Sequence, residues 1–474
     1  MNLTELTITR AHEGLEKKEF SAQELTKSFL NRIEKEDKKI NAFLTVTPES
    51  ALSQAKEVDG KISRGEKIDV LAGVPCAIKD NILVEDIRCT AASKVLENYT
   101  APYDATIVKK LKDRGAVILG KANLDEFAMG SSGENSGFYP TKNPRDLSRV
   151  PGGSSSGPAA AVAGDMAVYA LGSDTAGSIR YPASFCGIVG LRPTYGAVSR
   201  YGLIAMASSL DTIGPITKNI EDCKIVFDAI RGKDPFDSTS VESPQIQNTK
   251  YKIQDTKIGV PKEYFIKGID PEVEKIIRNA IKKYEAMGAK IEEVSLPHTE
   301  YAIATYYIIT PCEISANIAR YDGIKYGYRD DSGKDLMEIY LRSREGGFGS
   351  EVKRRIMLGT YALSAGYYDA YYLRAQKVRT LIRKDFEKVF EKVDVLMTPV
   401  SPFPAFKLGE KIEDPLSMYL CDVFTGPLSL AGLPGLSVPA GKIGDLPVGL
   451  QIIGKPFEEE KVLEIAKIGE ENYV

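Results

Sequence analysis

Two turns rich in glycine and serine constrain this chain more than any other feature. Residues 151–157 read Pro-Gly-Gly-Ser-Ser-Ser-Gly, residues 172–180 read Gly-Ser-Asp-Thr-Ala-Gly-Ser-Ile-Arg, and the two turns flank the apolar run 159–171. Each turn offers hydroxyl groups beside backbone N–H groups that no large side chain covers. Acyl transfer needs a serine nucleophile and preset donors for the oxyanion that forms when a carbonyl is attacked. The two turns therefore indicate a serine-based acyl-transfer site.

Such a serine needs a base, and histidine is a poor candidate here. The chain has only two histidines, His12 and His298, and neither lies in a motif, which disfavours a Ser-His-Asp triad. Lys79 closes the short apolar run 74–78 and is expected to point from the end of a strand into the protein. Burial disfavours the ammonium and lowers a lysine pKa from about 10.4 towards neutrality. A neutral Lys79 is the candidate base.

Three features taken together resemble a known family. They are Lys79, the Gly-Gly-Ser-Ser turn at 152–155 and the run 174–180. In their order and spacing they resemble the amidase signature family, and the resemblance covers nearly the whole chain. It implies that Ser178 is the nucleophile and Lys79 the terminal base, with Ser154 as the proton relay between them. The oxyanion hole that it implies consists of the backbone N–H groups of Thr175, Ala176 and Gly177.

The same resemblance implies a cis peptide bond between Gly153 and Ser154. The chain departs from the family pattern at two places: the family commonly has glycine in place of Ala176 and Gly-Gly-Ser in place of residues 156–158. Ala176 keeps its N–H, so its part in the oxyanion hole survives. Pro158 has no N–H, which a helix tolerates in its first turn. Neither change removes a catalytic side chain.

Taken one at a time, the motifs have plainer interpretations. A Gly-Ser turn is usually only a turn, and a single lysine beside a strand is usually a surface residue. A glycine-rich turn before a helix can also bind a phosphate. Here, however, no Gly-Lys-Ser/Thr closes the loop as a Walker motif requires. The occurrence of all three motifs in order favours the catalytic interpretation.

One branch of the family matches further segments. Residues 301–372 hold 12 of the 24 tyrosines, and together with residues 419–422 they resemble the glutaminase subunits of three-subunit, tRNA-dependent amidotransferases. The resemblance implies that Arg355 binds the α-carboxylate of glutamine and Asp422 its α-ammonium, with Tyr306 as a further contact. An arginine fork suits a carboxylate, and a carboxylate suits an ammonium group. The plainer alternative is that Arg355 and Asp422 are surface charges in an ion pair.

The expected reaction is hydrolysis of glutamine to glutamate, with the ammonia passed to a partner. In this branch of the family the partners are a B and a C subunit, and the partner activates Glu-tRNA(Gln) with ATP and Mg²⁺. We expect no metal site and no cofactor in this chain itself. Two alternatives stay open: a stand-alone amidase that acts on other small amides, and a scaffold subunit without catalysis.

Composition and charge limit the kinds of partner. The chain has 62 Lys and Arg against 65 Asp and Glu, a formal net charge of −3, and no basic stretch stands out, which argues against direct tRNA or DNA binding. The six cysteines are scattered without a C-x-x-C pair, so a zinc site is not expected. No apolar run reaches the roughly 18 residues of a membrane span, and the N-terminus carries acids without the apolar core of a signal peptide. We therefore expect a cytoplasmic protein that does not contact a membrane.

Helix and strand patterns alternate along the 474 residues. This alternation predicts an α/β fold built round a mostly parallel sheet. The family resemblance implies one domain over residues 1–474, a large mixed sheet with helices on both faces. Within it we expect an N-terminal helical segment at about 1–60, a signature core at about 70–220 and a helical substrate-pocket segment at about 300–390.

Local signals predict where several elements begin. Ser21 and Glu24 form a capping box ahead of an amphipathic helix. Asp104 is expected to cap a helix that runs through Leu111 and is ended by Gly115. A strand at 257–260 is followed by a helix that starts at Asp270.

Two longer segments are also interpreted. Tyrosines recur at intervals of three and four in residues 357–372, which predicts one helix packed by its aromatic rings. Residues 232–256 are polar and are expected to form an exposed loop.

Overall fold

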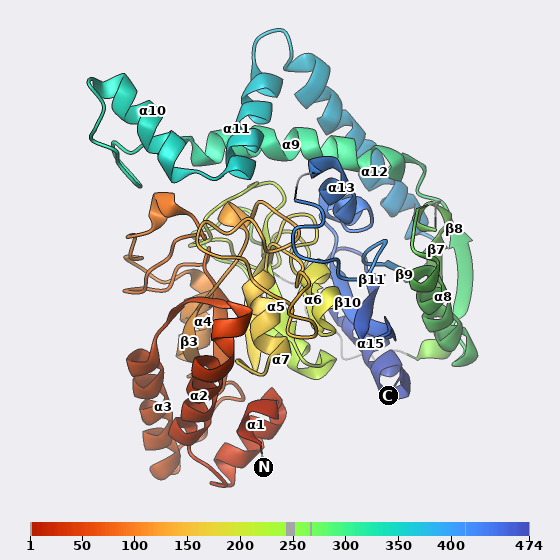
Figure 1. Ribbon diagram of the computed structural model, residues 1–474. Helices are drawn as coiled ribbons and strands as arrows, with labels where there is room; N and C mark the ends of the chain where they lie inside the picture. Colours follow the sequence, from red (N-terminus) through yellow and green to blue (C-terminus); the bar gives the residue numbers. More distant parts are fainter. Residues whose placement is uncertain (1, 243–251, 266–267, 413, 474) are drawn as a thin grey trace.

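A mixed sheet of eleven strands organises the residues that this computed structural model describes, namely 2–242, 252–265, 268–412 and 414–473 (Figure 1). Across the sheet the strands follow the order β1-β3-β2-β4-β6-β5-β10-β11-β9-β7-β8. Their bounds are β1 Phe43–Val46, β2 Pro75–Lys79, β3 Val117–Ala122, β4 Tyr169–Asp174, β5 Val189–Arg192, β6 Thr212–Thr217, β7 Lys257–Pro261, β8 Lys290–Val294, β9 Val395–Pro399, β10 Gly435–Ile443 and β11 Leu446–Ile453.

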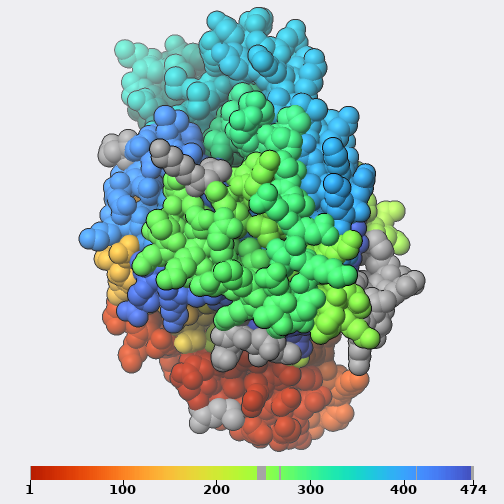
Figure 2. All heavy atoms as spheres, turned by 90° about the vertical axis from the view of Figure 1, so that its right-hand side faces the viewer, coloured from red at the N-terminus to blue at the C-terminus, as the bar shows by residue number. Residues whose placement is uncertain are grey.

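Helices cover both faces of the sheet and extend beyond it at two ends. Helices α1 to α3 form one end of the molecule and α9 to α12 the other (Figure 1), and the side view in Figure 2 shows the same order from bottom to top. The helices are α1 Ile8–Glu16, α2 Ala22–Ile40, α3 Pro48–Ser63, α4 Thr106–Asp113, α5 Ser156–Ala163, α6 Arg180–Cys186, α7 Ile220–Ile230, α8 Pro271–Ala286, α9 Ala302–Asn317, α10 Leu336–Gly347, α11 Ser350–Leu363, α12 Arg374–Val389, α13 Pro415–Tyr419, α14 Gly426–Ala431 and α15 Glu459–Tyr473.

The prediction of a mixed sheet is confirmed, but parallel pairs are fewer than expected. Strand β2 is parallel to β3 and β4, and β7 is parallel to β8 and β9, whereas the other six pairs of described strands are antiparallel. A helix connects β2 to β3 and another connects β7 to β8, as a parallel crossover requires. Strands β10 and β11 are instead joined by the short turn 444–445, and a connection that short permits only antiparallel pairing.

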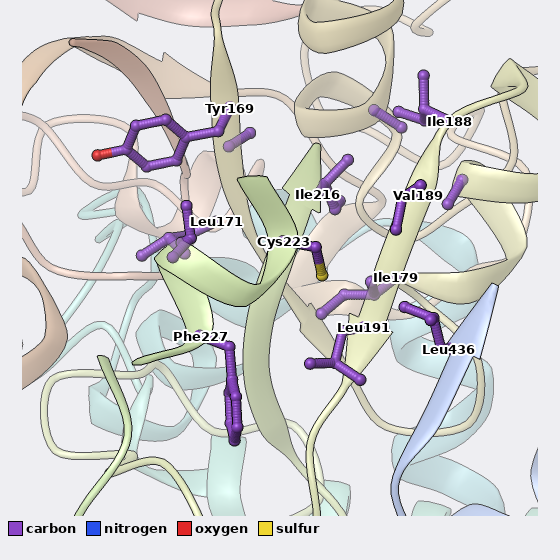
Figure 3. Close-up of a cluster of buried hydrophobic side chains, with 14 of the residues drawn as sticks. Tyr169, Leu171, Ile179, Ile188, Val189, Leu191, Ile216, Cys223, Phe227 and Leu436 are labelled. Atoms are coloured by element: carbon purple, nitrogen blue, oxygen red, sulfur yellow. The ribbon is translucent and has the colours of Figure 1, made fainter. Parts of the chain in front are cut away.

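A buried apolar core supports the middle of the sheet. Figure 3 shows side chains from β4, β5, β6 and β10 meeting those of α7. The labelled members are at most 3% exposed: Tyr169, Leu171, Ile179, Ile188, Val189, Leu191, Ile216, Cys223, Phe227 and Leu436. Burying one large aliphatic side chain stabilises a fold by roughly 1.5–3 kcal/mol. The core therefore stabilises β4, the strand that leads into the second Gly-Ser turn.

Most predicted element starts are confirmed. Ser21 Oγ accepts the N–H of Glu24 at 3.1 Å, and the Glu24 carboxylate accepts the N–H of Ser21 at 2.8 Å, so the capping box is present at the start of α2. Strand β7 covers the predicted 257–260, and the Asp270 side chain caps α8.

The predicted helix cap at Asp104 is wrong. Helix α4 begins at Thr106 after Ala105, and no side chain caps it. The Asp104 carboxylate instead accepts the backbone N–H of Glu85 and pairs with Lys112, both at 2.8 Å. The carboxylate that the local pattern assigned to the helix cap is used in tertiary contacts instead.

The two longer segments also differ from their predictions. Residues 357–372 do not form one helix, because α11 ends at Leu363, Gly366 has φ +87°, and a short π-helical turn, Asp369–Leu373, precedes α12. Several of its tyrosines are exposed and contact one another rather than the core. In the polar segment 232–256, residues 243–251 lie outside the described residues, and Asp234 and Ser240 are buried rather than exposed.

Candidate active site

The three catalytic motifs meet at one edge of the sheet. Strand β2 ends at Lys79 and β4 ends at Asp174, and because these strands pair in parallel their carboxyl ends lie at the same edge. The turn at 152–155 directly precedes α5, and Ser178 lies just after β4. The N–H of Ser155 donates to the carbonyl oxygen of Ser178 at 3.0 Å. Both turns are therefore joined beside Lys79.

Lys79 is fully buried, and its side-chain nitrogen contacts three serines. Nζ lies 2.8 Å from Oγ of Ser154 and of Ser155. It also lies 2.9 Å from Oγ of Ser173. Burial lowers the pKa of Lys79 to about 7, although nearby buried aspartates oppose the change. Near neutral pH a substantial share of Lys79 is therefore uncharged, as a general base must be.

Ser154 occupies a tightly packed turn. The peptide bond between Gly153 and Ser154 is cis, as predicted. A Cβ at position 153 would lie 2.0 Å from Oδ2 of Asp125, so only glycine fits there. The Asp125 carboxylate accepts the N–H groups of Gly133 and Asn135, and burial raises the pKa of Asp125 to about 6. The loop at 130–135 thus packs directly behind the turn that carries Ser154.

Ser178 is more open than its neighbours. It is 8% exposed, whereas Ser154 and Ser155 have no exposed surface. Its hydroxyl makes no hydrogen bond within the described ranges. The structure therefore contains the Lys79–Ser154 hydrogen bond of the expected relay but not a Ser154–Ser178 hydrogen bond. A reachable serine hydroxyl beside a lysine-paired serine has the arrangement that nucleophilic attack on a carbonyl needs.

The residues expected to form the oxyanion hole have free backbone donors. In the described part of the chain, no acceptor receives the N–H groups of these three residues, Thr175, Ala176 and Gly177. Ala176 does not adopt a positive φ, so its difference from the family pattern brings no backbone strain. Gly177 has φ +154°, and a Cβ there would lie 2.4 Å from Oγ1 of Thr425. Unpaired backbone N–H groups beside a serine hydroxyl suit an oxyanion.

A buried ion network, which the sequence analysis did not assign, supports this loop. The Asp174 carboxylate pairs with Arg180 and with Arg192, each at 3.0 Å, and none of the three side chains is exposed. Burial alone would raise the pKa of Asp174, but the two guanidinium groups hold it well below its usual range. Arg180 also donates to the carbonyl oxygen of Thr425 at 3.2 Å. The network joins the loop that carries Ser178 to the segment that carries Asp422.

The three residues predicted to bind glutamine are buried and lie together. Arg355 comes from α11, Tyr306 from α9, and Asp422 from the 3₁₀ turn Leu420–Val423. Tyr307, next to Tyr306, lies between the two charges: its hydroxyl donates to Asp422 Oδ2 at 2.7 Å, and the Arg355 guanidinium carbon lies 5.5 Å from its ring centre. Tyr306 meets the Tyr307 ring edge-on, with 4.9 Å between ring centres. Arg355 and Asp422 are therefore not an exposed ion pair.

Ser131 connects this charged pair to the turn that carries Ser154. Its hydroxyl donates to Asp422 Oδ1 at 3.4 Å, and its carbonyl oxygen accepts the N–H of Gly153 at 2.8 Å. Burial raises the pKa of Asp422 to about 6, although the Tyr307 hydroxyl and Arg355 oppose the change. Sequence analysis did not assign Ser131 a role, because a serine in an ordinary Gly-Ser loop gives no signal of its own.

Cavities mark only part of the site. One of about 90 Å³ is lined by Gly130, Ser132, Arg355 and Tyr419 among others, but by none of the three catalytic candidates. A larger hollow of about 780 Å³ lies between residues 94–103 and 317–328, and none of Lys79, Ser154 and Ser178 lines it. The smaller cavity therefore belongs to the Arg355 end of the site rather than to its reacting end.

The remaining sequence candidates lie elsewhere or are inert. His298 pairs with Asp385, and His12 lies 3.5 Å from Glu16. All six cysteines are buried and unpaired. Among the described residues no cluster of His, Cys, Asp or Glu is arranged to bind a metal ion. None of the helices described here combines the length and apolar composition that crossing a membrane requires.

Comparisons with known proteins give one consistent result. The model of the Amidase family matches residues 24–463. The A subunit of the glutamyl-tRNA(Gln) amidotransferase of Carboxydothermus hydrogenoformans is 60% identical over 475 residues, which covers 100% of this chain and 98% of the relative. A crystal structure of the corresponding A subunit from Thermotoga maritima superposes with a TM-score of 0.82 at 45% identity, covering 98% of this chain and 94% of that one. The peptide amidase of Stenotrophomonas maltophilia superposes with a TM-score of 0.81 at 29% identity, covering 99% and 97%.

Proposed function

This chain belongs to the amidase family, and on that premise we propose that it is the glutamine-hydrolysing subunit of a tRNA-dependent amidotransferase. The observation that carries the proposal is the pair of opposite charges beside the serines: Arg355 and Asp422 are both buried, and both lie against Tyr307. Glutamine presents the complementary pair, an α-carboxylate and an α-ammonium, at the far end from its carboxamide. Burying a charge is costly, and a site for simple amides has no use for a buried arginine and a buried aspartate beside its serines.

In the proposed reaction Ser178 attacks the carboxamide carbon. Its proton passes to Ser154 Oγ while the Ser154 proton passes to neutral Lys79, and the N–H groups of 175–177 stabilise the oxyanion. The carbon–nitrogen bond then breaks, and ammonia leaves with a proton returned through Ser154. Water attacks the glutamyl ester on Ser178 through the same relay and releases glutamate. The Nζ–Oγ distance of 2.8 Å and the lowered pKa of Lys79 support this direction of proton transfer.

Substrate recognition is assigned to three side chains. Arg355 binds the α-carboxylate of glutamine through its two terminal NH₂ groups. Asp422, as a carboxylate, binds the α-ammonium. Tyr306 contributes an aromatic wall, supported by its burial beside Tyr307. We assign the triad to the signature core at about 70–220 of a single 1–474 domain. In the glutamine pocket, Arg355 and Tyr306 come from the helical segment at about 300–390, whereas Asp422 comes from the turn 420–423 outside it.

Released ammonia requires an acceptor. We assign that role to partner B and C subunits, because the relatives are named as the A subunit of an enzyme that acts on glutamyl-tRNA(Gln). ATP, Mg²⁺ and Glu-tRNA(Gln) are then bound by the partner, and the reaction takes place in the cytoplasm. The net charge of −3 agrees with a chain that does not itself bind tRNA.

The test is steady-state production of glutamate from glutamine. The purified chain is assayed alone, with candidate B and C subunits, and with these subunits plus ATP and charged tRNA. We expect slow hydrolysis by the isolated chain and a higher kcat in the complete mixture, because small shifts of about 1 Å in the pocket alter near-attack geometry. Hydrolysis of aliphatic amides without any action on glutamine would favour a stand-alone amidase. A chain that hydrolyses no amide under any of these conditions would be a scaffold.

A further inference from the structure

Behind Arg355 and Asp422 lies a continuous series of side-chain contacts that the proposed chemistry does not use. It runs from Arg355 to Glu351, then to Tyr419, then to Tyr307 and finally to Asp422. Its members come from α11, α13, α9 and the turn 420–423. No sequence motif accounts for the meeting of these four segments, and the proposed reaction does not use their contacts. The contacts therefore need an explanation of their own.

The first contact orients the arginine. Glu351 Oε1 accepts Nε of Arg355 at 2.7 Å, and the two side chains are only 11% and 4% exposed. The two terminal NH₂ groups of Arg355 make no hydrogen bond to any described residue. A carboxylate binds arginine best through two parallel N–H bonds. Glu351 contacts Arg355 only at Nε, while its other oxygen, Oε2, accepts from Nη1 of the exposed Arg354. Glu351 thus fixes the plane of the Arg355 guanidinium and leaves its terminal pair free for a ligand.

The next contacts connect the arginine to the aspartate. The Tyr419 hydroxyl donates to the same Glu351 oxygen at 3.2 Å, and its ring stacks on Tyr307 with 3.8 Å between ring centres and 22° between planes. The Tyr307 hydroxyl donates to Asp422 Oδ2 at 2.7 Å. Stacked rings permit little change in separation, because both are packed in a buried site. The two charges are thus separated by a rigid spacer.

We propose that Glu351, Tyr419 and Tyr307 are positioning residues that set the separation of Arg355 and Asp422, and so restrict the site to amides carrying both an α-carboxylate and an α-ammonium. The inference rests on the proposed glutaminase function. An ordinary i,i+4 helix pair such as Glu338 with Arg342 on α10 is exposed and connects to no second charge. The Glu351–Arg355 pair, by contrast, is buried. The hydrogen bond from Tyr419 and its stack on Tyr307 connect this pair to Asp422.

Two truncated amides, each lacking one α-group of glutamine, test the two ends of the spacer independently. Glutaramate has the carboxylate and the carboxamide of glutamine but no amine, and 4-aminobutyramide has the amine but no carboxylate. Their dissociation constants and that of glutamine are measured by titration calorimetry in a Ser178→Ala background, where no hydrolysis interferes. The KM and kcat for glutamine are measured in the otherwise unchanged enzyme, with butyramide, which lacks both α-groups, supplied at high concentration as a slow reference substrate.

Tyr307→Phe keeps the ring stack and removes only the hydroxyl on Asp422. Since a hydrogen bond to a charged group is lost, we expect glutamine and 4-aminobutyramide to bind about tenfold more weakly and glutaramate to bind unchanged. Glu351→Ala should weaken the binding of glutamine and of glutaramate by a similar factor and leave the binding of 4-aminobutyramide unchanged. Glu351→Gln should restore most of the affinity, because its amide oxygen still accepts from Arg355 and Tyr419.

The controls are Glu338→Ala, which breaks the exposed helix pair, and Tyr368→Phe, which removes an exposed tyrosine hydroxyl. Both should leave all constants unchanged. The proposal is overturned if one variant weakens the binding of both truncated amides equally. It is also overturned if kcat falls as much for butyramide as for glutamine, because either result would indicate a general structural role. If the unaltered enzyme fails to hydrolyse glutamine, the proposed function fails instead, and the calorimetric constants still report on the spacer.

Discussion

Nζ of Lys79 lies 2.8 Å from Oγ of Ser154, and neither residue has any exposed surface. In the proposed relay, proton transfer within this pair meets no competition from water. Burial lowers the pKa of Lys79 from its usual value of about 10.5 to about 7, so the uncharged form is populated under ordinary conditions. The pH dependence of the reaction follows from this contact.

The first prediction concerns the rate as a function of pH. Protonated Lys79 cannot accept the proton of Ser154, so kcat/KM should rise with pH through about 7 and level off above it. Glutaramate, supplied at high concentration as a slow substrate, separates this dependence from the charge of Asp422, because it has no α-ammonium. A profile that is flat between about pH 6 and 8, or one that rises only near the usual lysine pKa of about 10.4, would contradict the assignment of Lys79.

Glutamine binding should show a second, separate pH dependence. Burial raises the pKa of Asp422 to about 6, so Asp422 becomes protonated and uncharged as the pH falls through that value. The attraction for the α-ammonium is then lost, and the dissociation constant of glutamine in a Ser178→Ala background should increase below about pH 6, by at most tenfold for each unit. Glutaramate, measured in parallel, should not show this increase. A parallel increase for both ligands would remove Asp422 from the ammonium site.

Single and double variants test whether the relay acts as a unit. Lys79→Ala and Ser154→Ala should each reduce kcat by roughly 10³-fold or more, and the double variant should be little worse than either single one. The reason is that one proton moves through both groups, so the loss of either interrupts the same step. Far-UV circular dichroism checks that the fold is intact. Effects that multiply in the double variant would show that the two residues act in different steps.

The ion network under the nucleophile loop should matter for stability. Asp174→Ala leaves the guanidinium groups of Arg180 and Arg192 buried without their carboxylate. Breaking a buried pair in this way lowers the free energy of unfolding by about 3–5 kcal/mol. Urea unfolding of this variant is compared with that of Glu338→Ala, which removes an exposed pair and should cost under about 1 kcal/mol. Equal stability of the two variants would mean that solvent or relaxation compensates the buried charges.

The catalytic candidates were predictable from sequence because each lies in a short, continuous motif. Lys79, the turn at 152–155 and the run at 174–180 carry their signal locally, and the parallel pairing of β2 with β4 brings them together. Ser173 and Asp174 lie beside the motifs, yet their contacts with Lys79 and Arg192 depend on strands that pair across the sheet.

The supporting residues of the pocket were not predictable in the same way. Glu351, Tyr307 and Tyr419 come from three segments far apart in the chain, and only packing decides which tyrosine among 24 stacks on which. The error at Asp104 has a similar origin, since a contact with Glu85 outweighs a local capping preference. Local patterns thus point to the candidate catalytic residues, while the geometry proposed to select the substrate arises from tertiary contacts.

The most direct test of the whole account is to identify the residue that carries the glutamyl group during turnover. The enzyme is mixed with glutamine, quenched in acid within a single turnover, digested and analysed by mass spectrometry. We predict a glutamyl ester on the peptide that contains Ser178, and neither ester nor glutamate production in Ser178→Ala. A glutamyl group on a cysteine, or continued glutamate production by Ser178→Ala, would contradict the account.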